Sequence, residues 1–411
     1  MKCRIRSSAK GHGMRRMAKL AAAGAVLLCL GAAQAFATDE PLEITGTTVF
    51  TKGEGGYNCF RIPALVRTQD RSALLAFAEG RRGDCDDTGD IDVVLKRSTD
   101  DGRTWQALEL VADGAGDTRG NPVPVVDRGT GRITLLTTHN PGSDCAGGGS
   151  CTRTPFLQHS VDPLGTQWTE PVAQPQLMKP EWNTWYATGP GHGLQMTRGE
   201  HVNRMVAGIN FEGDGGVKGA GIVHSDDGGT TWQIGATDDR TGQPIKPQEL
   251  SLLETVDAEL YAAARNQDNS GTTIAEGNQA HAVSADGGAT FREPFELVPE
   301  LNGPVVQGSV VRLRATTAGD PYNLILFSGP YNTDPNMDHR RHTMRIRTSS
   351  DEGATWQEVG TVIDATWAAY SDLINLGGGW AGLLYEAGAP ESEDANQTIR
   401  YARFSETDLA R

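Results

Sequence analysis

A short motif recurs five times along the chain, and its spacing constrains the fold more than any other feature of the sequence. Four copies read Ser-x-Asp-x-Gly-x-Thr followed by an aromatic residue: STDDGRTW from Ser98, SDDGGTTW from Ser225, SADGGATF from Ser284 and SSDEGATW from Ser349. A fifth copy, SVDPLGTQW from Ser160, carries an insertion. Successive copies begin 62, 65, 59 and 65 residues apart. This spacing is close to one supersecondary unit and indicates a repeat architecture.

The motif has the composition of a turn between two strands. Its Asp side chain can accept backbone N–H groups, its Gly can take a positive φ, and its aromatic residue can pack under the hairpin as the next strand begins. The chain also has 51 glycines and many short alternating apolar segments, which favour an all-β fold. The motif therefore predicts turns and is not itself catalytic.

Strand-like segments around the first copy predict a four-stranded antiparallel meander, made of residues 60–67, 73–80, 91–98 and 105–112. Similar groups follow at about 120–170, 185–235, 248–297 and 305–363. The last group has three strands, near 370–376, 380–386 and 398–405, and residues 43–50 can supply its fourth. We therefore predict a six-bladed β-propeller of four-stranded antiparallel blades, closed by an N-terminal strand, because closure protects the sheet edges.

The first 37 residues have the pattern of an export signal. Seven basic residues precede the apolar run LAAAGAVLLCLGAA, and AFA at 35–37 fits a small-residue cleavage site. We expect cleavage near Ala37, a single domain over residues 38–411, and a secreted protein without a membrane anchor. Removal of the leader leaves 30 Lys and Arg against 52 Asp and Glu. This acidic balance disfavours nucleic acid and anionic membrane surfaces as partners.

Four cysteines lie outside the leader: Cys59, Cys85, Cys145 and Cys151. An even set in an oxidising compartment indicates two disulfides, for which three pairings are possible. The loop CAGGGSC could close locally as Cys145–Cys151, which would leave Cys59 with Cys85. A metal site is the rival interpretation, but the sequence has no CxxC pair and no His cluster.

Charged and phenolic residues from separate blades are predicted to meet at one end of the strands. In an up-and-down blade, the start of strand one and the loop between strands two and three lie at the end opposite the motif turns. Some residues occupy such a strand start or loop. Others form pairs at equal distances from a hairpin turn at the motif end, which places both members at the opposite end. The residues placed there are Arg61, Arg81, Asp87, Glu249, Arg265, Arg341, Tyr370 and Glu386. Each alone is more often a solvated side chain, but together they indicate a site.

Several stretches, taken together, resemble the exo-α-sialidases over essentially the whole chain after the leader. They are FRIP (60–63), the four motifs, which resemble Asp boxes, TWYATGPGHGLQ (184–195), QGSVVR (307–312) and AYSDL (369–373). The resemblance implies a glycoside hydrolase that releases terminal sialic acids from glycoproteins, glycolipids or oligosaccharides, with retention of configuration. It implies no cofactor and no metal. We also expect a monomer.

The resemblance assigns roles to individual residues. It places Arg61, Arg265 and Arg341 on the substrate carboxylate, Asp87 as acid and base, Tyr370 as nucleophile, Glu249 as the base for Tyr370, and Glu386 as the acid that braces Arg61. Arg81 is a further candidate for substrate contact. Guanidinium groups suit a carboxylate because they bind it through paired, charge-assisted hydrogen bonds. A neutral phenol suits attack beside that carboxylate because a second anion would be repelled.

Some alternatives stay open in the sequence. Asp87 is preferred to Asp86 because DTGDI matches the loop pattern of the family, and Arg341 to Arg340 because of its six-residue lead to Arg347. A Cys59–Cys85 disulfide would tether the Asp87 loop. Trp185 and Tyr186 are candidates for the lining of an N-acyl pocket. The alternative functions are a trans-sialidase and a non-catalytic sialoglycan-binding propeller.

Overall fold

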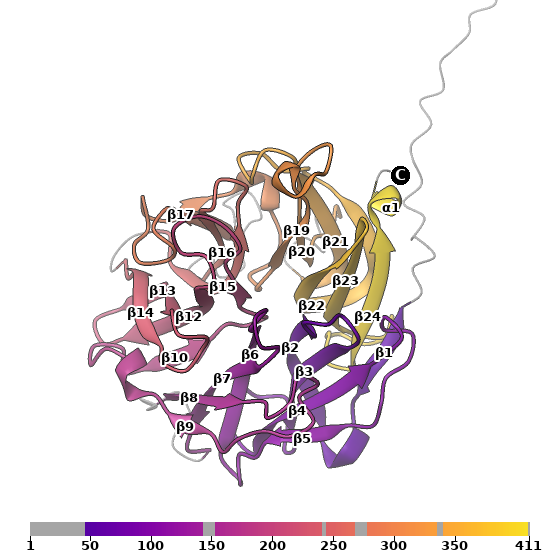
Figure 1. Cartoon of the computed structure of the whole chain (residues 1–411). Helices are drawn as coiled ribbons and strands as arrows, with labels where there is room; N and C mark the ends of the chain where they lie inside the picture. The colour runs from indigo at the N-terminus through magenta and orange to yellow at the C-terminus, as the bar shows by residue number, and fades with distance from the viewer. Residues whose placement is uncertain (1–45, 143–152, 241–243, 268–277, 335–339, 410–411) are drawn as a thin grey trace, which may run out of the picture. The chain divides into compact units, whose positions relative to one another are not determined.

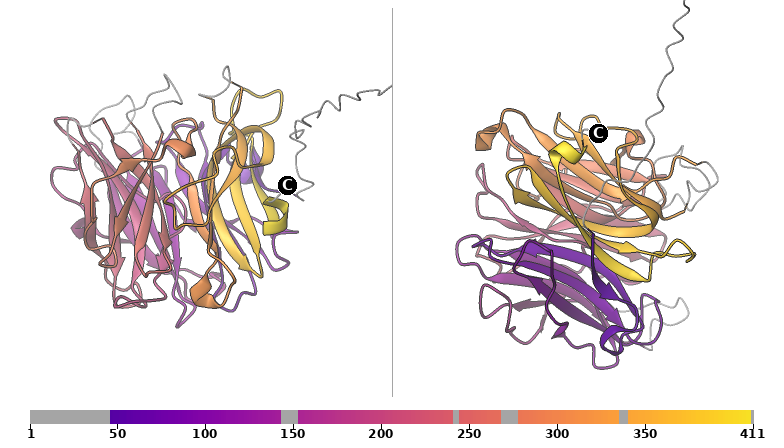
Figure 2. Two further views of the ribbon diagram at one scale, coloured as in Figure 1. Left: turned by 90° about the horizontal axis from the view of Figure 1, so that it is seen from above. Right: turned by 90° about the vertical axis from the view of Figure 1, so that its right-hand side faces the viewer.

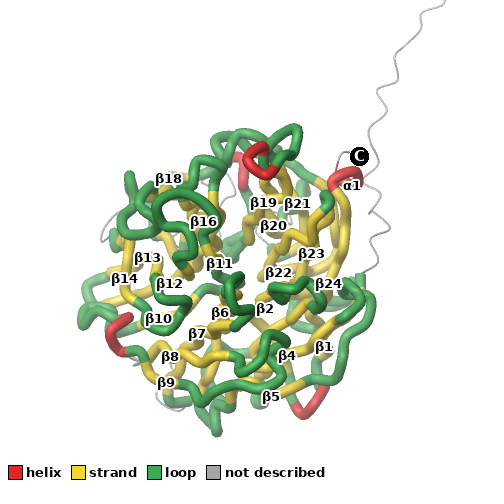
Figure 3. The backbone as a smooth tube through the Cα atoms, in the orientation of Figure 1, coloured by secondary structure: helices red, strands yellow, loops and turns green. Residues whose placement is uncertain are grey.

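The computed structural model describes residues 46–409 apart from 143–152, 241–243, 268–277 and 335–339. The proposed leader, Cys145 and Cys151 therefore lie outside the described residues. The described residues belong to one compact unit, Glu40–Arg411, whose regular structure is almost entirely β-strand (Figure 3). The α-helix α1 (Glu406–Leu409) is a single turn. No helix in the described part of the chain is long and apolar enough to cross a bilayer.

Antiparallel strands follow one another in groups that match the predicted meanders. The first group is β2 (Cys59–Arg67), β3 (Leu74–Arg81), β4 (Ile91–Ser98) and β5 (Glu109–Ala112), and the second is β6 (Thr118–Val126), β7 (Ile133–Asn140), β8 (Thr154–His159) and β9 (Val172–Ala173). The third comprises β10 (Trp185–Thr188), β11 (Leu194–Gln195), β12 (Met205–Gly213), β13 (Val217–Ser225) and β14 (Gln233–Asp238). The fourth comprises β15 (Pro247–Glu254), β16 (Leu260–Asn266), β17 (Gln279–Ser284) and β18 (Glu296–Leu297).

The remaining strands form one seven-stranded sheet in the order β1-β24-β23-β22-β21-β20-β19. They are β19 (Ser309–Arg314), β20 (Leu324–Pro330), β21 (His342–Ser349), β22 (Thr361–Gly377), β23 (Trp380–Ala387), β24 (Thr398–Ser405) and β1 (Thr47–Thr51). As predicted, the N-terminal strand β1 completes the sheet of the C-terminal strands, because it pairs with β24. The first and second groups also share one sheet, through a single parallel pairing between β4 and β6.

The sequence-based boundary between the fifth and sixth groups was wrong. Separate strands ending near 363 and beginning near 370 were expected, but β22 runs without a break over 17 residues. Its first part pairs with β21 and its second part with β23. The backbone at residues 365–369 stays extended because β21 and β23 supply backbone hydrogen-bond partners for the two parts of β22.

Within the unit, the groups follow one another in chain order around a common centre (Figure 1). Strands near that centre contact one another, as in the pairs β2 with β6, β2 with β22, β15 with β19, and β19 with β22. Large apolar side chains fill the space between neighbouring groups, for example Val123, Leu136, Trp182 and Phe211. The strands run between two ends that carry the connecting turns and loops (Figure 2).

The turns that carry the repeated motif have the predicted hydrogen bonding. In the first, the Ser98 hydroxyl donates to Asp100 and accepts the Gly102 N–H at 2.8 Å. Asp100 accepts the Thr104 N–H at 2.9 Å and its hydroxyl at 2.6 Å, and Gly102 has φ +84°. The same pattern recurs at Asp227, Asp286 and Asp351.

Removal of one such carboxylate is expected to weaken the fold. Asp100→Ala leaves the Thr104 donors without their acceptor, so the free energy of unfolding should fall by about 1–3 kcal/mol. Hydrogen bonds from the Thr104 hydroxyl and N–H lower the pKa of Asp100 to about 2. A carboxyl whose pKa is lower in the folded state than in the unfolded state stabilises the fold at pH values above its unfolded-state pKa. This stabilisation is lost as the pH falls through the folded-state pKa. Denaturant unfolding should therefore show a deficit at pH 5 that shrinks toward pH 2.

The matched control is Asp257→Ala. Asp257 is exposed in the β15–β16 hairpin, so the substitution removes a carboxylate without removing an acceptor from a motif turn. An Asp100→Ala variant as stable at pH 5 as Asp257→Ala would contradict this account of the motif.

Candidate active site

The predicted site residues and the motif turns lie at opposite ends of the strands, as expected. In the first group, Arg61 pairs with Glu79 at one end of the sheet, whereas Leu74 pairs with Ser98 at the other. In the fourth group, Arg265 pairs with Gln279, whereas the motif residue Ser284 pairs with Leu260. The register therefore separates the turns that stabilise the fold from the end where the charged residues gather.

A β-bulge explains why Arg61 and Pro63 share one strand. The register of β2 with β3 shifts between Arg61 and Ala64, and Ile62 takes a positive φ of 55°. A bulge is a position where Pro is tolerated and where a side chain is turned in a new direction. The register also shifts near Glu249 in β15 and near Tyr370 in β22, so irregular pairing accompanies site residues in these strands too.

Arg61 is held in place by a fully buried carboxylate. Its Nε donates to Glu386 Oε1 at 2.7 Å, and the Glu386 side chain is 0% exposed. The backbone N–H groups of Ile62 and Tyr370 also donate to Glu386. Burial opposes the charge on Arg61, but Glu386 outweighs burial and raises the Arg61 pKa. Glu386 therefore fixes both the charge and the position of the guanidinium.

Tyr370, Glu249 and Arg265 form a compact cluster from three strands. The Tyr370 hydroxyl donates to Glu249 Oε1 at 2.5 Å. Arg265 Nη1 donates to Glu249 Oε2 at 2.8 Å and to the Tyr370 hydroxyl oxygen at 3.0 Å. Burial raises the pKa of Tyr370, and the Glu249 carboxylate raises it further. The phenol is therefore neutral in the resting protein, with a hydrogen-bonded acceptor for its proton.

Two more guanidinium groups lie close to the Tyr370 ring. The Cζ of Arg61 is 5.3 Å from the ring centroid and that of Arg341 is 5.6 Å away. Arg341 Nη2 donates to the Val305 carbonyl at 3.0 Å. Arg340, the alternative considered from the sequence, instead has its Cζ 5.6 Å from the Trp367 ring centroid. The structure thus brings Arg61, Arg265 and Arg341 to Tyr370.

Asp87 lies at the same end of the strands, where it forms an ion pair with Arg81. Arg81 Nη1 lies 2.9 Å from Asp87 Oδ1, and the Asp87 side chain is 64% exposed. Arg81 also donates to the buried Glu79 at 2.6 Å. The surrounding protein partly removes the Asp87 carboxyl from water, which acts to raise its pKa, but the charges of Arg81 and Arg61 outweigh this effect and lower the pKa. The disulfide between Cys59 and Cys85 is present and anchors the loop that carries Asp87.

A cavity of about 360 Å³ opens beside Arg61 and Arg341. Its other lining residues are Arg340, Trp367, Ala369 and the segment 393–396. Sequence reasoning missed this segment because nothing in its composition distinguishes it from an ordinary acidic loop. It also missed Glu79, which lies two residues before Arg81 in AFAEGR and could have been found from that spacing.

The two aromatic candidates for an N-acyl pocket behave differently. Tyr186 is 0% exposed and packs with Trp182 in the apolar core, so it is not available to line a pocket. Trp185 is half-buried, and the Cζ of Arg153 lies 3.7 Å from its ring centroid. Among the described residues, no group of His, Cys, Asp and Glu side chains is arranged to hold a metal ion.

Comparison with known proteins gives consistent similarities. A family model described as a BNR repeat-like domain matches residues 72–383. A sialidase of Micromonospora viridifaciens is 30% identical over 381 residues, which cover 89% of this chain and 54% of that protein. An exo-alpha-sialidase of Arthroderma benhamiae is 32% identical, covering 73% of this chain and 69% of that protein. An exo-alpha-sialidase of Aspergillus fumigatus is 31% identical, covering 81% and 79%. The chain spans about half the length of the Micromonospora protein.

Solved structures show the same fold. The Hadza microbial sialidase Hz136 superposes with a TM-score of 0.73 and 26% identity, covering 89% of this chain and 69% of that one. The intramolecular trans-sialidase from Ruminococcus gnavus superposes with a TM-score of 0.68, covering 88% of this chain and 98% of that one. At 20% identity, the second similarity concerns the fold alone.

Proposed function

The chain belongs to the sialidase family of glycoside hydrolases, and from this premise we propose that it is an exo-α-sialidase that hydrolyses terminal sialic acids of glycoconjugates with retention of configuration. The observation that carries the proposal is the cluster around Tyr370. A neutral phenol hydrogen-bonded to Glu249 lies beside three arginines. This arrangement suits a sugar whose carboxylate sits on the reacting carbon, because the arginines bind the carboxylate while the phenol attacks.

Each residue has a proposed step. Arg61, Arg265 and Arg341 hold the substrate carboxylate and so place the anomeric carbon over the Tyr370 hydroxyl. Glu249 takes the phenolic proton as the oxygen–carbon bond forms, and Asp87 gives a proton to the departing oxygen. Asp87 then takes a proton from water as the water oxygen attacks the anomeric carbon of the glycosyl–tyrosine. The bond from that carbon to the Tyr370 oxygen breaks, and Glu249 returns its proton to that oxygen to restore the phenol. Glu386 keeps Arg61 in position throughout.

The arrangement of strands also supports a finer description of the fold. We propose that the successive groups are six blades of a propeller and that the β1–β24 pairing closes it. Residues 1–37 are proposed to be a signal peptide and residues 38–411 the catalytic domain. Secretion into an oxidising compartment accords with the Cys59–Cys85 disulfide.

The direct test is release of a fluorophore from an aryl α-sialoside by the purified protein. We expect turnover by the parent chain and none from the corresponding β-galactoside or α-fucoside. Product analysis then separates hydrolysis from transfer. With the aryl sialoside as donor and lactose present, hydrolysis gives free sialic acid, whereas transfer gives sialyl-lactose. A folded protein that binds sialyl-lactose without cleaving either substrate would instead identify a glycan-binding protein.

Arg61→Lys tests the proposed contact with the carboxylate. A lysine keeps the charge but loses the paired geometry of the guanidinium and its bond to Glu386. Loss of a hydrogen bond to a charged group costs about 1.5–3 kcal/mol, so kcat/KM should fall by about 10- to 100-fold. Arg103→Lys is the matched control, because Arg103 is exposed in a motif turn at the opposite end of the strands. Equal kinetics in the two variants would contradict the role of Arg61.

A further inference from the structure

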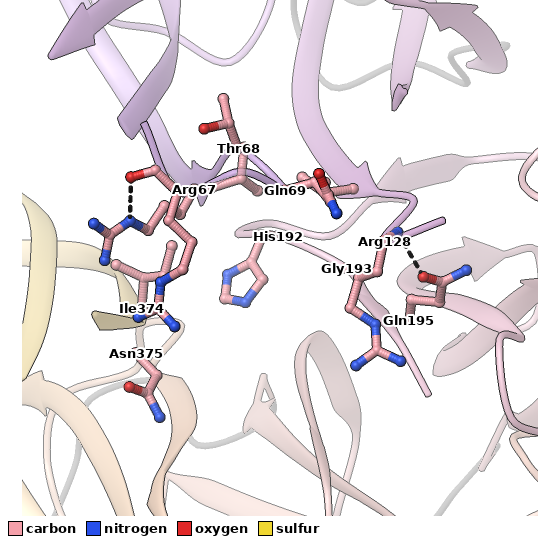
Figure 4. A pocket seen from close by; sticks show the side chains of 12 residues that line it. Arg67, Thr68, Gln69, Arg128, His192, Gly193, Gln195, Ile374 and Asn375 are labelled. Atoms are coloured by element: carbon pink, nitrogen blue, oxygen red, sulfur yellow. Dashed lines mark hydrogen bonds between the residues drawn. The ribbon is translucent and has the colours of Figure 1, made fainter. Parts of the chain in front are cut away.

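A second cavity, of about 320 Å³, lies at the end of the strands opposite the active site. Its walls come from the β2–β3 and β6–β7 hairpins, the segment 192–195 and the end of β22 (Figure 4). The register that puts Arg61 at one end of β2 puts Arg67 at the other. The cavity is thus separated from the proposed reaction by the length of the central strands, so binding there does not require sialidase activity.

The residues that line this second cavity include several basic side chains and no acidic one. Three arginines, Arg67, Arg71 and Arg128, and one histidine, His192, line it together with Gln69, Gln195 and Asn375, and none of its lining residues is acidic. Acidic residues outnumber basic ones in the chain by 52 to 37. A wall of this composition is therefore unlike the rest of the protein, and it favours an anionic occupant.

The three arginines differ in how many of their guanidinium N–H donors are used in hydrogen bonds or ion pairs within the protein. Arg67 pairs with Asp101 at 3.0 Å and donates to the Leu376 carbonyl at 2.8 Å. Arg71 also donates to that carbonyl. The Arg128 side chain makes one long contact, 3.4 Å to the Met196 carbonyl, and no carboxylate among the described residues pairs with it. Most donors of Arg128 are therefore free for a ligand.

His192 adds a donor on the floor of the second cavity. Its Nδ1 lies 2.9 Å from Asp372 Oδ1, which leaves Nε2 for another partner. Burial acts to lower the His192 pKa, but Asp372 outweighs burial and raises it. Figure 4 shows the imidazole between the side chains of Arg67 and Arg128. Asp372 therefore stabilises a proton on His192 through Nδ1, and no hydrogen bond within the described residues occupies Nε2.

Asp372 connects this floor to the central strands. Besides His192 it accepts the Leu65 N–H of β2 at 2.7 Å and the Ser309 hydroxyl of β19 at 3.1 Å, and it is 1% exposed. A ligand that holds His192 against Asp372 would therefore stabilise contacts among three strands. Binding at this cavity should be visible as a rise in thermal stability.

We propose that this second cavity binds a small multivalent oxyanion, held by Arg128 and His192 with Arg67 and Arg71 around it. The shared chemistry is that of a phosphate group or of a compact dicarboxylate. Both present several acceptors to guanidinium and imidazolium donors. The ligand is bound through charge-assisted hydrogen bonds and is not transformed.

The test uses the full chain with Arg341→Ala, because the proposed carboxylate site also attracts anions and must be weakened. Inorganic phosphate and succinate are titrated separately at constant ionic strength, with chloride as the balancing anion. Imidazole NMR signals, assigned with His192→Gln, report on the cavity, and the thermal midpoint reports on stability. We expect a saturable shift of the His192 signal with one or both anions, and a rise in the midpoint.

Arg128→Gln in the same background should weaken this binding by about tenfold or more, since it removes charge-assisted bonds. Arg103→Gln is the matched control, because Arg103 is exposed and lies outside the cavity. It removes the same charge and should leave the affinity unchanged. A His192 signal that does not respond to either anion, or one that responds equally in both variants, would overturn the proposal.

Discussion

Tyr370→Phe is expected to lower kcat/KM for sialosides by about 10²–10⁴-fold while the protein stays folded. The substitution removes the oxygen that lies 2.5 Å from Glu249 and leaves the ring in contact with Arg61 and Arg341. Tyr322→Phe is the control, because Tyr322 is 46% exposed and its hydroxyl donates to Glu406, which is not a site residue. Near-normal activity of Tyr370→Phe on natural substrates would rule out the phenol as nucleophile.

A covalent label tests the same step directly. A 3-fluorosialyl fluoride should trap the glycosyl–enzyme, because the fluorine at carbon 3 destabilises the positively charged transition state for turnover. Mass spectrometry should place the label on the peptide that contains Tyr370. Glu249→Gln should slow the trapping without moving the label, since it removes the base and keeps the nucleophile. A label on Glu249 or Asp87 would replace the proposed mechanism with attack by a carboxylate.

Asp87→Ala is expected to affect substrates unequally. For natural sialosides, loss of the acid should lower kcat/KM by about 10²–10⁴-fold. An aryl sialoside has a leaving group that departs with little protonation, so its cleavage should fall much less. Asp86→Ala is the matched control, since the Asp86 backbone donates to Asp84 and its carboxylate has no assigned role. Equal losses on both substrates, or a larger loss in Asp86→Ala, would reassign the acid.

The lowered pKa of Asp87 bears on this step. Arg81 and Arg61 keep the carboxylate ionised in the free protein, which suits activation of water but not donation of a proton. In the proposed complex, the substrate carboxylate binds Arg61 and offsets one of those charges. Binding itself should therefore raise the Asp87 pKa and prepare it as an acid.

Local patterns and hairpin symmetry predicted the pairs that the structure brings together. Turn residues indicated where each hairpin reverses, and equal spacing on either side of the turn placed Glu249 opposite Arg265 and Tyr370 opposite Glu386. The bulge at Ile62 was not predictable, because the Ile62 N–H, at a residue with positive φ, donates to Glu386, 324 positions away. The continuous strand β22 was missed for a similar reason, since two different neighbours stabilise its two parts.

Contacts made by loops could not be predicted from the sequence. The segment 393–396 borders the cavity beside Arg61, yet its position depends on how the β23–β24 connection folds over Trp367. The two acidic partners of Arg81, Glu79 and Asp87, come from a strand and a loop. The two-residue spacing places Glu79 and Arg81 on one face of β3, but spacing gives no orientation for Asp87 in the loop.

The pairing of β1 with β24 imposes an order on folding. Thr47 lies opposite Tyr401, so this contact closes nearly the longest loop that the described chain allows, and such contacts form slowly. During synthesis, β1 is made early, but it cannot pair until β24, almost the last strand, has been made. Until then β1 and the unfinished sheet have open edges that other chains can join. Refolding yield should therefore fall with protein concentration more steeply than for a chain of equal length whose strands pair only with near neighbours.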